Sequence, residues 1–136
     1  MDGLVSDYSS LLQNASKSDM TLICPGGGEV KVHSLIMATR SPVFDSMVKS
    51  DMEEMASGIV KINDFEIGVV KALVNYIYTA KIEHDFEDII DLLKIGAKYL
   101  IKSLVEDCSK KLANLITVVN TVFEQDLWLK SSLFIV

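Results

Sequence analysis

The segment from Val32 to Met47 constrains the fold of this chain more than any other. Its sequence, VHSLIMATRSPVFDSM, carries apolar residues at helical spacing on both sides of Ser41-Pro42. Serine is a good N-cap, and proline in the first position of a helix costs no hydrogen bond. We therefore predict two short helices that meet at this dipeptide, with Ser34 as the N-cap of the first.

The segments around this helix pair mix helices and strands. The N-terminal part is expected to form a helix over residues 3–14 and then two strands, over 20–24 and 30–32, which a turn over 25–28 joins. After the helix pair we expect a loop over 49–58, a strand over 59–62 and a helix capped by Asn63 or Asp64. The remaining elements are a helix from Asp85, on which Gly96 allows close helix approach, a helix that carries Leu104 and Cys108, and a last segment from about Thr117. No regular strand–helix–strand repeat is present, so the predicted class is α+β.

Composition and charge narrow the class of protein. The chain has 136 residues, a length typical of one domain, and 49% of them are hydrophobic, which is enough for a core. A net charge of −6 repels a phosphate backbone, so we expect no direct contact with nucleic acid. No apolar run approaches the roughly 20 residues of a membrane-spanning helix, so we expect no membrane partner. The opening MDGLVSDYSS lacks the pattern of a signal peptide.

The chemistry-bearing residues do not form a known catalytic or metal-binding pattern. Cys24 and Cys108 lie in apolar segments and are predicted to be buried free thiols, which favours the nucleus or the cytoplasm. His33 and His84 lack partners at the spacing that a zinc site needs. The glycines at 26–28 are not followed by the lysine of a phosphate-binding loop. We therefore expect no enzymatic activity, no metal and no cofactor.

Two stretches are candidates for contacts with other proteins. The N-terminal helix carries an apolar stripe of Leu4, Tyr8, Leu11 and Leu12, which is either a core face or an interface. Later, Met52 precedes Glu53-Glu54 in the expected loop. A flexible thioether beside carboxylates suits a partner with an apolar pocket and a basic rim, although a solvated acidic loop has the same composition.

Several segments together resemble the BTB/POZ domain. They are Ser18-Asp19-Met20-Thr21-Leu22, Val32-His33-Ser34, Arg40-Ser41-Pro42-Val43-Phe44, Ile62-Asn63-Asp64 and Tyr76-Ile77-Tyr78-Thr79. The resemblance covers about residues 4–115, and the RSPVF segment followed by Met-Glu-Glu is most similar to the speckle-type POZ (MATH-BTB) group.

This resemblance implies a small mixed sheet flanked by a cluster of helices. It also implies a BTB/POZ domain over residues 1–116, with an N-terminal dimerisation helix, and the start of a C-terminal helical extension over residues 117–136. Domains of this kind form homodimers. The interface positions that the resemblance gives here are Leu4, Tyr8, Leu11, Leu12 and Asp19, the last as a buried acid near the two-fold axis.

The resemblance further implies a role as a substrate adaptor for a cullin-3 ubiquitin ligase. Members of the group bind the N-terminal region of cullin-3 through a hydrophobic residue, any residue, and then glutamate, a pattern that Met52 and Glu54 fit. The preceding helix would add Ser46 and Met47. The substrate would be held by a domain that is not in this chain.

Other members of the family keep alternatives open. In zinc-finger transcription factors the dimer groove binds a co-repressor peptide, and a basic residue follows the histidine where this chain has Ser34. A potassium-channel tetramerisation domain is a related possibility. The family's Tyr-Thr-Gly turn is Tyr-Thr-Ala here, so Ala80 is expected to adopt a positive φ at a cost of about 1 kcal/mol.

Overall fold

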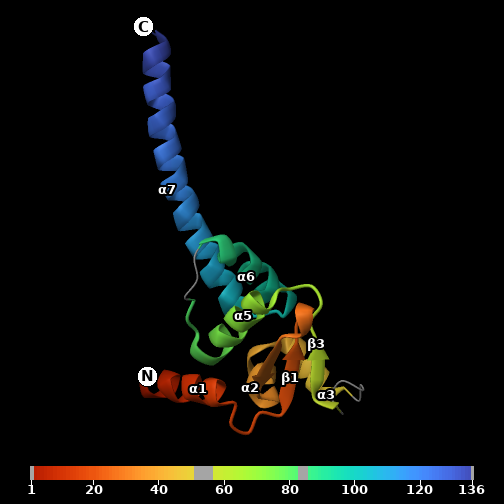
Figure 1. Cartoon of the computed structure of the whole chain (residues 1–136). Coiled ribbons are helices and arrows are strands. Elements are labelled where there is room, and N and C mark those ends of the chain that lie inside the picture. Colours follow the sequence, from red (N-terminus) through yellow and green to blue (C-terminus); the bar gives the residue numbers. More distant parts are fainter. Residues whose placement is uncertain (1, 51–56, 83–85, 136) are drawn as a thin grey trace.

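The computed structural model describes residues 2–50, 57–82 and 86–135 (Figure 1). Its elements in chain order are α1 (Asp2–Asn14), β1 (Met20–Ile23), the 3-10 turn η1 (Pro25–Gly27), β2 (Glu29–Val32), α2 (Ser34–Arg40), α3 (Pro42–Lys49), β3 (Ile59–Lys61), α5 (Ile67–Thr79), α6 (Phe86–Lys98) and α7 (Lys102–Ile135). Helices and strands follow one another irregularly, which confirms the predicted α+β class.

The three strands form one small mixed sheet in the order β2-β1-β3. Strands β1 and β2 are the predicted hairpin, antiparallel with Leu22 opposite Val30. Strand β3 runs parallel to β1 on its other side, with Leu22 beside Val60. Side chains alternate along each strand, and the three residues just named are all buried, so one face of the sheet belongs to the core.

Helix α5 forms the centre of the core. It contacts α1, α2, α6 and β2, and its buried residues run from Val70 to Thr79. It begins at Ile67, so the predicted cap at Asn63 or Asp64 is wrong. The carboxylate of Asp64 instead accepts a hydrogen bond from Lys98 Nζ at 2.5 Å, which ties the start of this segment to α6.

The break between α2 and α3 has the predicted geometry. Pro42 opens α3, and Ser41 Oγ caps the helix by accepting the Phe44 N–H at 3.2 Å. The same hydroxyl donates to the carbonyl of Tyr99 at 2.6 Å, and the ring of Phe44 stacks on the ring of Tyr99 at 4.8 Å. The Ser41-Pro42 dipeptide therefore holds the helix pair against the α6–α7 turn.

The predicted cap at Ser34 is wrong. Ser34 is already the first residue of α2, and its own N–H and hydroxyl donate to the carboxylate of Asp19 at 2.7 and 2.5 Å. The carboxylate of Asp19, which is distant in the sequence, thus accepts a hydrogen bond from the first turn of α2, in place of a local serine cap.

Helices α6 and α7 pack closely at Gly96. A Cβ at this position would lie 3.0 Å from Leu104 Cδ2, tighter than an ordinary van der Waals contact, so glycine eases the predicted close approach. The two helices expected around Leu104 and beyond Thr117 are one continuous helix, α7, because no proline or glycine interrupts residues 102–135. Its last turns extend far from the rest of the molecule (Figure 1).

Candidate interaction surfaces

Helix α1 presents part of its apolar stripe to solvent. Leu4 is 54% exposed and Tyr8 is 41% exposed, whereas Leu11 and Leu12 are partly buried against the core. The C-terminal end of the stripe therefore packs against the core, and its N-terminal end is exposed to solvent. The assignment of these four residues to a dimer interface stays a prediction.

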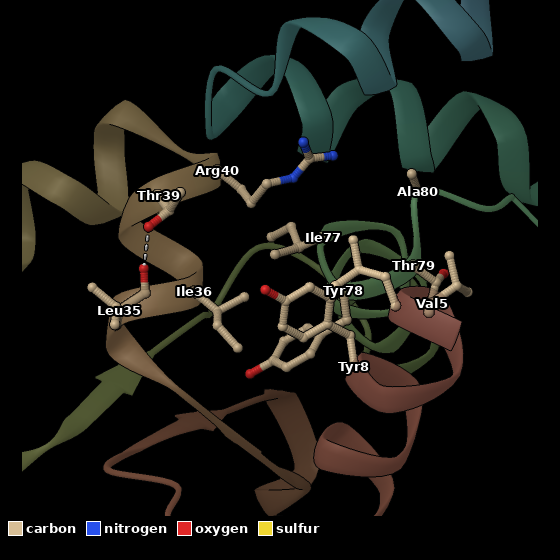
Figure 2. Close-up of a pocket in the computed structure, with 11 residues that line it drawn as sticks. Val5, Tyr8, Leu35, Ile36, Thr39, Arg40, Ile77, Tyr78, Thr79 and Ala80 are labelled. Atoms are coloured by element: carbon tan, nitrogen blue, oxygen red, sulfur yellow. Dashed lines mark hydrogen bonds between the residues drawn. The ribbon is translucent and has the colours of Figure 1, made fainter. Parts of the chain in front are cut away.

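A pocket of about 340 Å³ lies between α1, α2 and the end of α5. Figure 2 shows α1 and α2 on opposite sides of it, with Ile77 and Tyr78 of α5 between them. Its lining is mostly apolar and consists of Leu4, Val5, Tyr8, Leu35, Ile36, Thr39, Arg40, Ile77, Tyr78, Thr79 and Ala80. We call the exposed apolar residues around it, Leu4, Tyr8 and Leu35, the α1–α2 surface.

Leu35 is the most exposed large apolar residue of this surface, at 76%. It lies on α2, so the sequence alone did not connect it with the stripe on α1. Ala80 closes the other end of the pocket with φ 58° and ψ 26°, which confirms the left-handed conformation expected at this turn. Its backbone N–H donates to the carbonyl of Tyr76 and ends α5.

Buried hydrogen bonds fix the floor of the pocket. The Tyr78 hydroxyl accepts the His33 backbone N–H at 2.8 Å and lies 2.7 Å from His33 Nδ1. His33 Nε2 lies 2.5 Å from the carbonyl of Ser16, which can only accept, so Nε2 carries the proton and Nδ1 accepts from Tyr78 in the neutral ring. Burial raises the pKa of Tyr78, and the His33 N–H opposes this effect.

Asp19 lies at the N-terminus of α2 and is exposed in the single chain, where the resemblance implied a buried acid. Partial burial tends to raise the pKa of Asp19, but the hydrogen bonds from Ser34 outweigh this effect and leave the pKa below its usual value of 3.8. The carboxylate therefore has a structural role within the chain. Its place in a dimer interface stays a prediction.

Ser46 and Met47 lie on α3, beside a second, more open depression of about 490 Å³. This depression, which we call the α3 surface, is lined by Pro42, Val43, Ser46, Met47, Ser50 and Leu100. Leu100 comes from the α6–α7 turn, has φ 55° and is 58% exposed. Met52 and Glu54, the other two predicted cullin contacts, lie outside the described residues.

Sequence reasoning missed Leu100. It lies more than fifty positions from Met47, and only the contacts of Tyr99 with Ser41 and Phe44 bring the two segments together. The available signal was a large apolar residue between two helices, where a polar residue is more usual.

The described residues offer little for catalysis or metal binding. Within ranges 2–50, 57–82 and 86–135, no three histidine, cysteine or acidic side chains form a group that could hold a metal ion. Cys24 and Cys108 are buried free thiols, as predicted, and burial raises the pKa of both, that of Cys108 to about 11. No helix in these ranges is long and apolar enough to cross a membrane.

Comparison with known proteins identifies similar chains. A family model described as BTB/POZ domain matches residues 8–115. The BTB/POZ domain-containing protein At4g08455 of Arabidopsis thaliana is 31% identical over 120 residues, covering 85% of this chain and 49% of that protein. The TD and POZ domain-containing protein 4 of Mus musculus is 33% identical over 119 residues, covering 86% of this chain and 32% of that protein.

The chain thus spans about half and about a third of the length of these two relatives. Among solved structures, the BTB domain of zebrafish PATZ1 superposes with a TM-score of 0.70 at 16% identity, covering 82% of this chain and 90% of that one. At this identity the likeness concerns the fold alone.

Proposed function

Because the chain belongs to the BTB/POZ family, we propose that it acts as a homodimeric substrate adaptor for a cullin-3 ubiquitin ligase. BTB domains are protein-interaction and dimerisation modules and are generally not enzymes. The proposal adds a specific partner, cullin-3, and assigns the recognition of the substrate to a domain outside this chain. Such an adaptor would work in the nucleus or the cytoplasm.

The exposed apolar residues of the α1–α2 surface support the homodimer. A two-fold interface uses the same patch on both copies, so the patch must be complementary to itself. Leu4, Tyr8 and Leu35 offer an apolar patch with a pocket of about 340 Å³ beside it, which would receive side chains of a second copy. Exposed apolar patches of this kind mark interaction sites.

The α3 surface carries the cullin part of the proposal. Ser46 and Met47, which the resemblance assigns to cullin contact, share one open apolar depression with Leu100. Met52 and Glu54 follow the end of α3 at Lys49 by only a few residues. Because this segment follows α3 so closely in the sequence, the proposal takes Met52 and Glu54 as a further part of the same contact.

The mechanism is one of proximity. A scaffold that holds a substrate near the ubiquitin-transfer machinery raises its local concentration to roughly the millimolar range, and no catalytic residue of the adaptor is needed. A dimer presents two such scaffolds, so multivalent substrates gain avidity.

The dimer is tested with Leu35→Asp. The residue is 76% exposed in the single chain, so the change leaves the fold intact but places an unpaired carboxylate on each side of the interface, at a cost of about 3 kcal/mol or more. Sedimentation equilibrium should show the wild type as a dimer and the variant near the monomer mass of 15.1 kDa. Ile90→Asp, an exposed position on α6, is the matched control and should stay dimeric. A monomeric wild type would reject the homodimer.

The cullin contact is tested by calorimetry with the N-terminal region of cullin-3. We expect a dissociation constant on the order of 1 µM, weakened about tenfold or more by Met52→Asp and by Leu100→Asp, with Ile90→Asp within about twofold of wild type. Light scattering on each sample controls for the dimer. If the dimeric wild type gives no binding heat, the adaptor proposal fails.

The alternative function is a dimer that binds a co-repressor peptide in a groove near the two-fold axis. The observation in its favour is the apolar pocket beside Tyr8, which has Arg40 in its lining as a cation for an acidic peptide. Ser34 argues against this alternative. Its hydroxyl donates a hydrogen bond to the Asp19 carboxylate, whereas in the co-repressor-binding members a basic residue pairs with that carboxylate. Binding of such a peptide in the pocket, together with no binding of cullin-3, would favour this alternative.

A further inference from the structure

Strand β2 is an edge of the sheet with unpaired backbone groups. The strand order is β2-β1-β3, so only one side of β2 is paired with a strand of the described residues. On β1, Thr21 and Ile23 bond toward β3, through the Gly58 carbonyl and the Ile62 N–H. Their neighbours Leu22 and Cys24 therefore bond toward Val30 and Gly28.

This alternation fixes which groups of β2 are free. Because Val30 and Val32 point their backbone N–H and C=O toward β1, Glu29 and Lys31 point theirs to the outer edge. No helix, turn or side chain of the described residues bonds to these outer groups. The edge is therefore able to pair with a further strand, as exposed sheet edges do in β-augmentation.

A groove of about 640 Å³ runs beside this edge, between β2 and the pair of helices α1 and α5. We call it the edge groove. Its apolar lining includes Leu12 of α1, Val30 of β2 and Val74 of α5. Its charged lining consists of Glu29, Lys31 and Lys71. It is separate from the α1–α2 surface and from the α3 surface, with which it shares no residue.

Two lysines, Lys31 and Lys71, outnumber the one acidic residue of the lining, Glu29. Lys31 and Lys71 are both exposed, and neither has a carboxylate at salt-bridge distance within the described ranges. On a chain with a net charge of −6 this is a local basic site. It attracts a segment of opposite charge.

We propose that the edge groove binds an extended acidic segment of a partner protein, which joins the sheet as a new strand beside β2. The backbone of the segment pairs with the outer groups of Glu29 and Lys31. Side chains alternate along a strand, so one set lies over Leu12 and Val74 and is apolar. The other set lies beside Glu29 and Lys31. An acidic residue opposite Lys31 forms a favourable cross-strand pair, and Lys71 attracts further acidic residues at the rim.

A second copy of this chain fits the groove less well. Two copies joined edge to edge would bring the same pair of helices, with Lys71 on α5, to both sides of the contact. An extended segment from a partner brings opposite charge and little bulk. Self-association through this edge is therefore one of the outcomes that the test must detect.

The test uses the 136-residue chain and a blocked, dye-labelled octapeptide of alternating valine and glutamate. We expect fluorescence anisotropy to give a dissociation constant on the order of 100 µM or tighter, with affinity falling as salt rises. Lys31→Glu together with Lys71→Glu should weaken binding at least about tenfold. The matched double variant Lys94→Glu with Lys110→Glu changes net charge equally on α6 and α7 and should stay within about twofold. Circular dichroism controls for folding.

Two further peptides separate pairing from simple charge attraction. The first is the valine–glutamate octapeptide N-methylated at alternate residues, so that one edge of the peptide strand has no amide N–H groups, and it should lose binding. The second is an octapeptide of alternating valine and lysine, which should not bind. Three results would overturn the proposal: no binding at about 1 mM peptide, equal binding of the N-methylated peptide, or no effect of the Lys31/Lys71 reversal. Oligomers larger than a dimer that the same reversal dissolves would show that a second copy occupies the edge instead.

Discussion

The two halves of helix α7 differ in how they bury their apolar side chains. In the first half, Leu104 and Cys108 are fully buried against α6 and the rest of the core. In the second half, four β-branched residues are each more than half exposed, namely Ile116, Val118, Val119 and Val122. The helix itself runs on without interruption.

The difference shows that helix continuity and tertiary packing are separate properties of this chain. The first half has apolar residues at a spacing of four, which gives one buried stripe. The second half also has apolar residues at helical spacing, such as Val118, Val119 and Val122, but these three side chains are more than half exposed. The first half therefore belongs to the core, and the apolar side chains described in the second half lie at the surface of the single chain.

The largest expected contrast is in thiol reactivity. Burial raises the pKa of Cys108 to about 11, and since the thiolate is the reactive form, its population near pH 8 is about 100-fold below that of a thiol with the usual pKa of 9.0. A cysteine introduced by Val119→Cys, at an exposed position, should react with a disulfide reagent at least about 100-fold faster. Mass spectrometry of the labelled peptides measures both sites in one sample. Equal rates would mean that the first half of α7 opens as readily as the second.

Truncation of side chains should separate the halves in stability. Leu104→Ala leaves a cavity at a fully buried site against α6 and should lower the free energy of unfolding by about 3 kcal/mol. Val119→Ala removes two exposed methyl groups and should change it by less than about 0.5 kcal/mol. Urea unfolding, followed by circular dichroism, measures both. A large loss in Val119→Ala would place the second half within the cooperative fold.

A smaller effect is expected where the Tyr76 hydroxyl of α5 bonds to the first half of α7. The Tyr76 hydroxyl donates to Asp107 Oδ2 at 2.7 Å. Tyr76→Phe removes the donor while keeping the ring, and should lower the free energy of unfolding by about 1 kcal/mol. Thermal unfolding of wild type and variant gives the value. An unchanged midpoint would show that solvent replaces this bond fully.

The smallest effect is expected from removing the second half. A chain that ends at Ile116 keeps the buried contacts of α7 and should unfold within about 0.5 kcal/mol of the full chain. The same experiment tests the predicted boundary between residues 1–116 and 117–136. A destabilised short chain would show instead that the extension is part of the domain.

Local signals predicted most of the elements. The apolar stripe gave α1 over 3–14, where the structure has Asp2–Asn14. The strong punctuation at Ser41-Pro42 predicted the break between α2 and α3, and Gly96 predicted the close approach of α6 and α7. These features depend on neighbours in the sequence, or on a residue with special backbone geometry, so a single sequence was enough to predict them.

The failures came from residues whose partners are distant in sequence. Ser34 and Asp64 look like helix caps, but Asp19 and Lys98 bind them instead. The separate segment expected from about Thr117 is part of α7, because the change in apolar pattern there reflects loss of packing and not a break in the backbone. The α3 surface needed Leu100, which only the folded chain brings beside Met47.

The placement of β1 between its two partners sets an order of events in time. Strand β2 follows β1 after one short turn, so this hairpin forms on the order of microseconds. Strand β3 follows β1 in the sequence only after β2 and both helices α2 and α3. Because this long stretch of chain must be ordered before β3 pairs with β1, the pairing is slow. The sheet is therefore expected to be completed last at β3, and this long-range closure, rather than the hairpin, sets the rate at which the molecule folds.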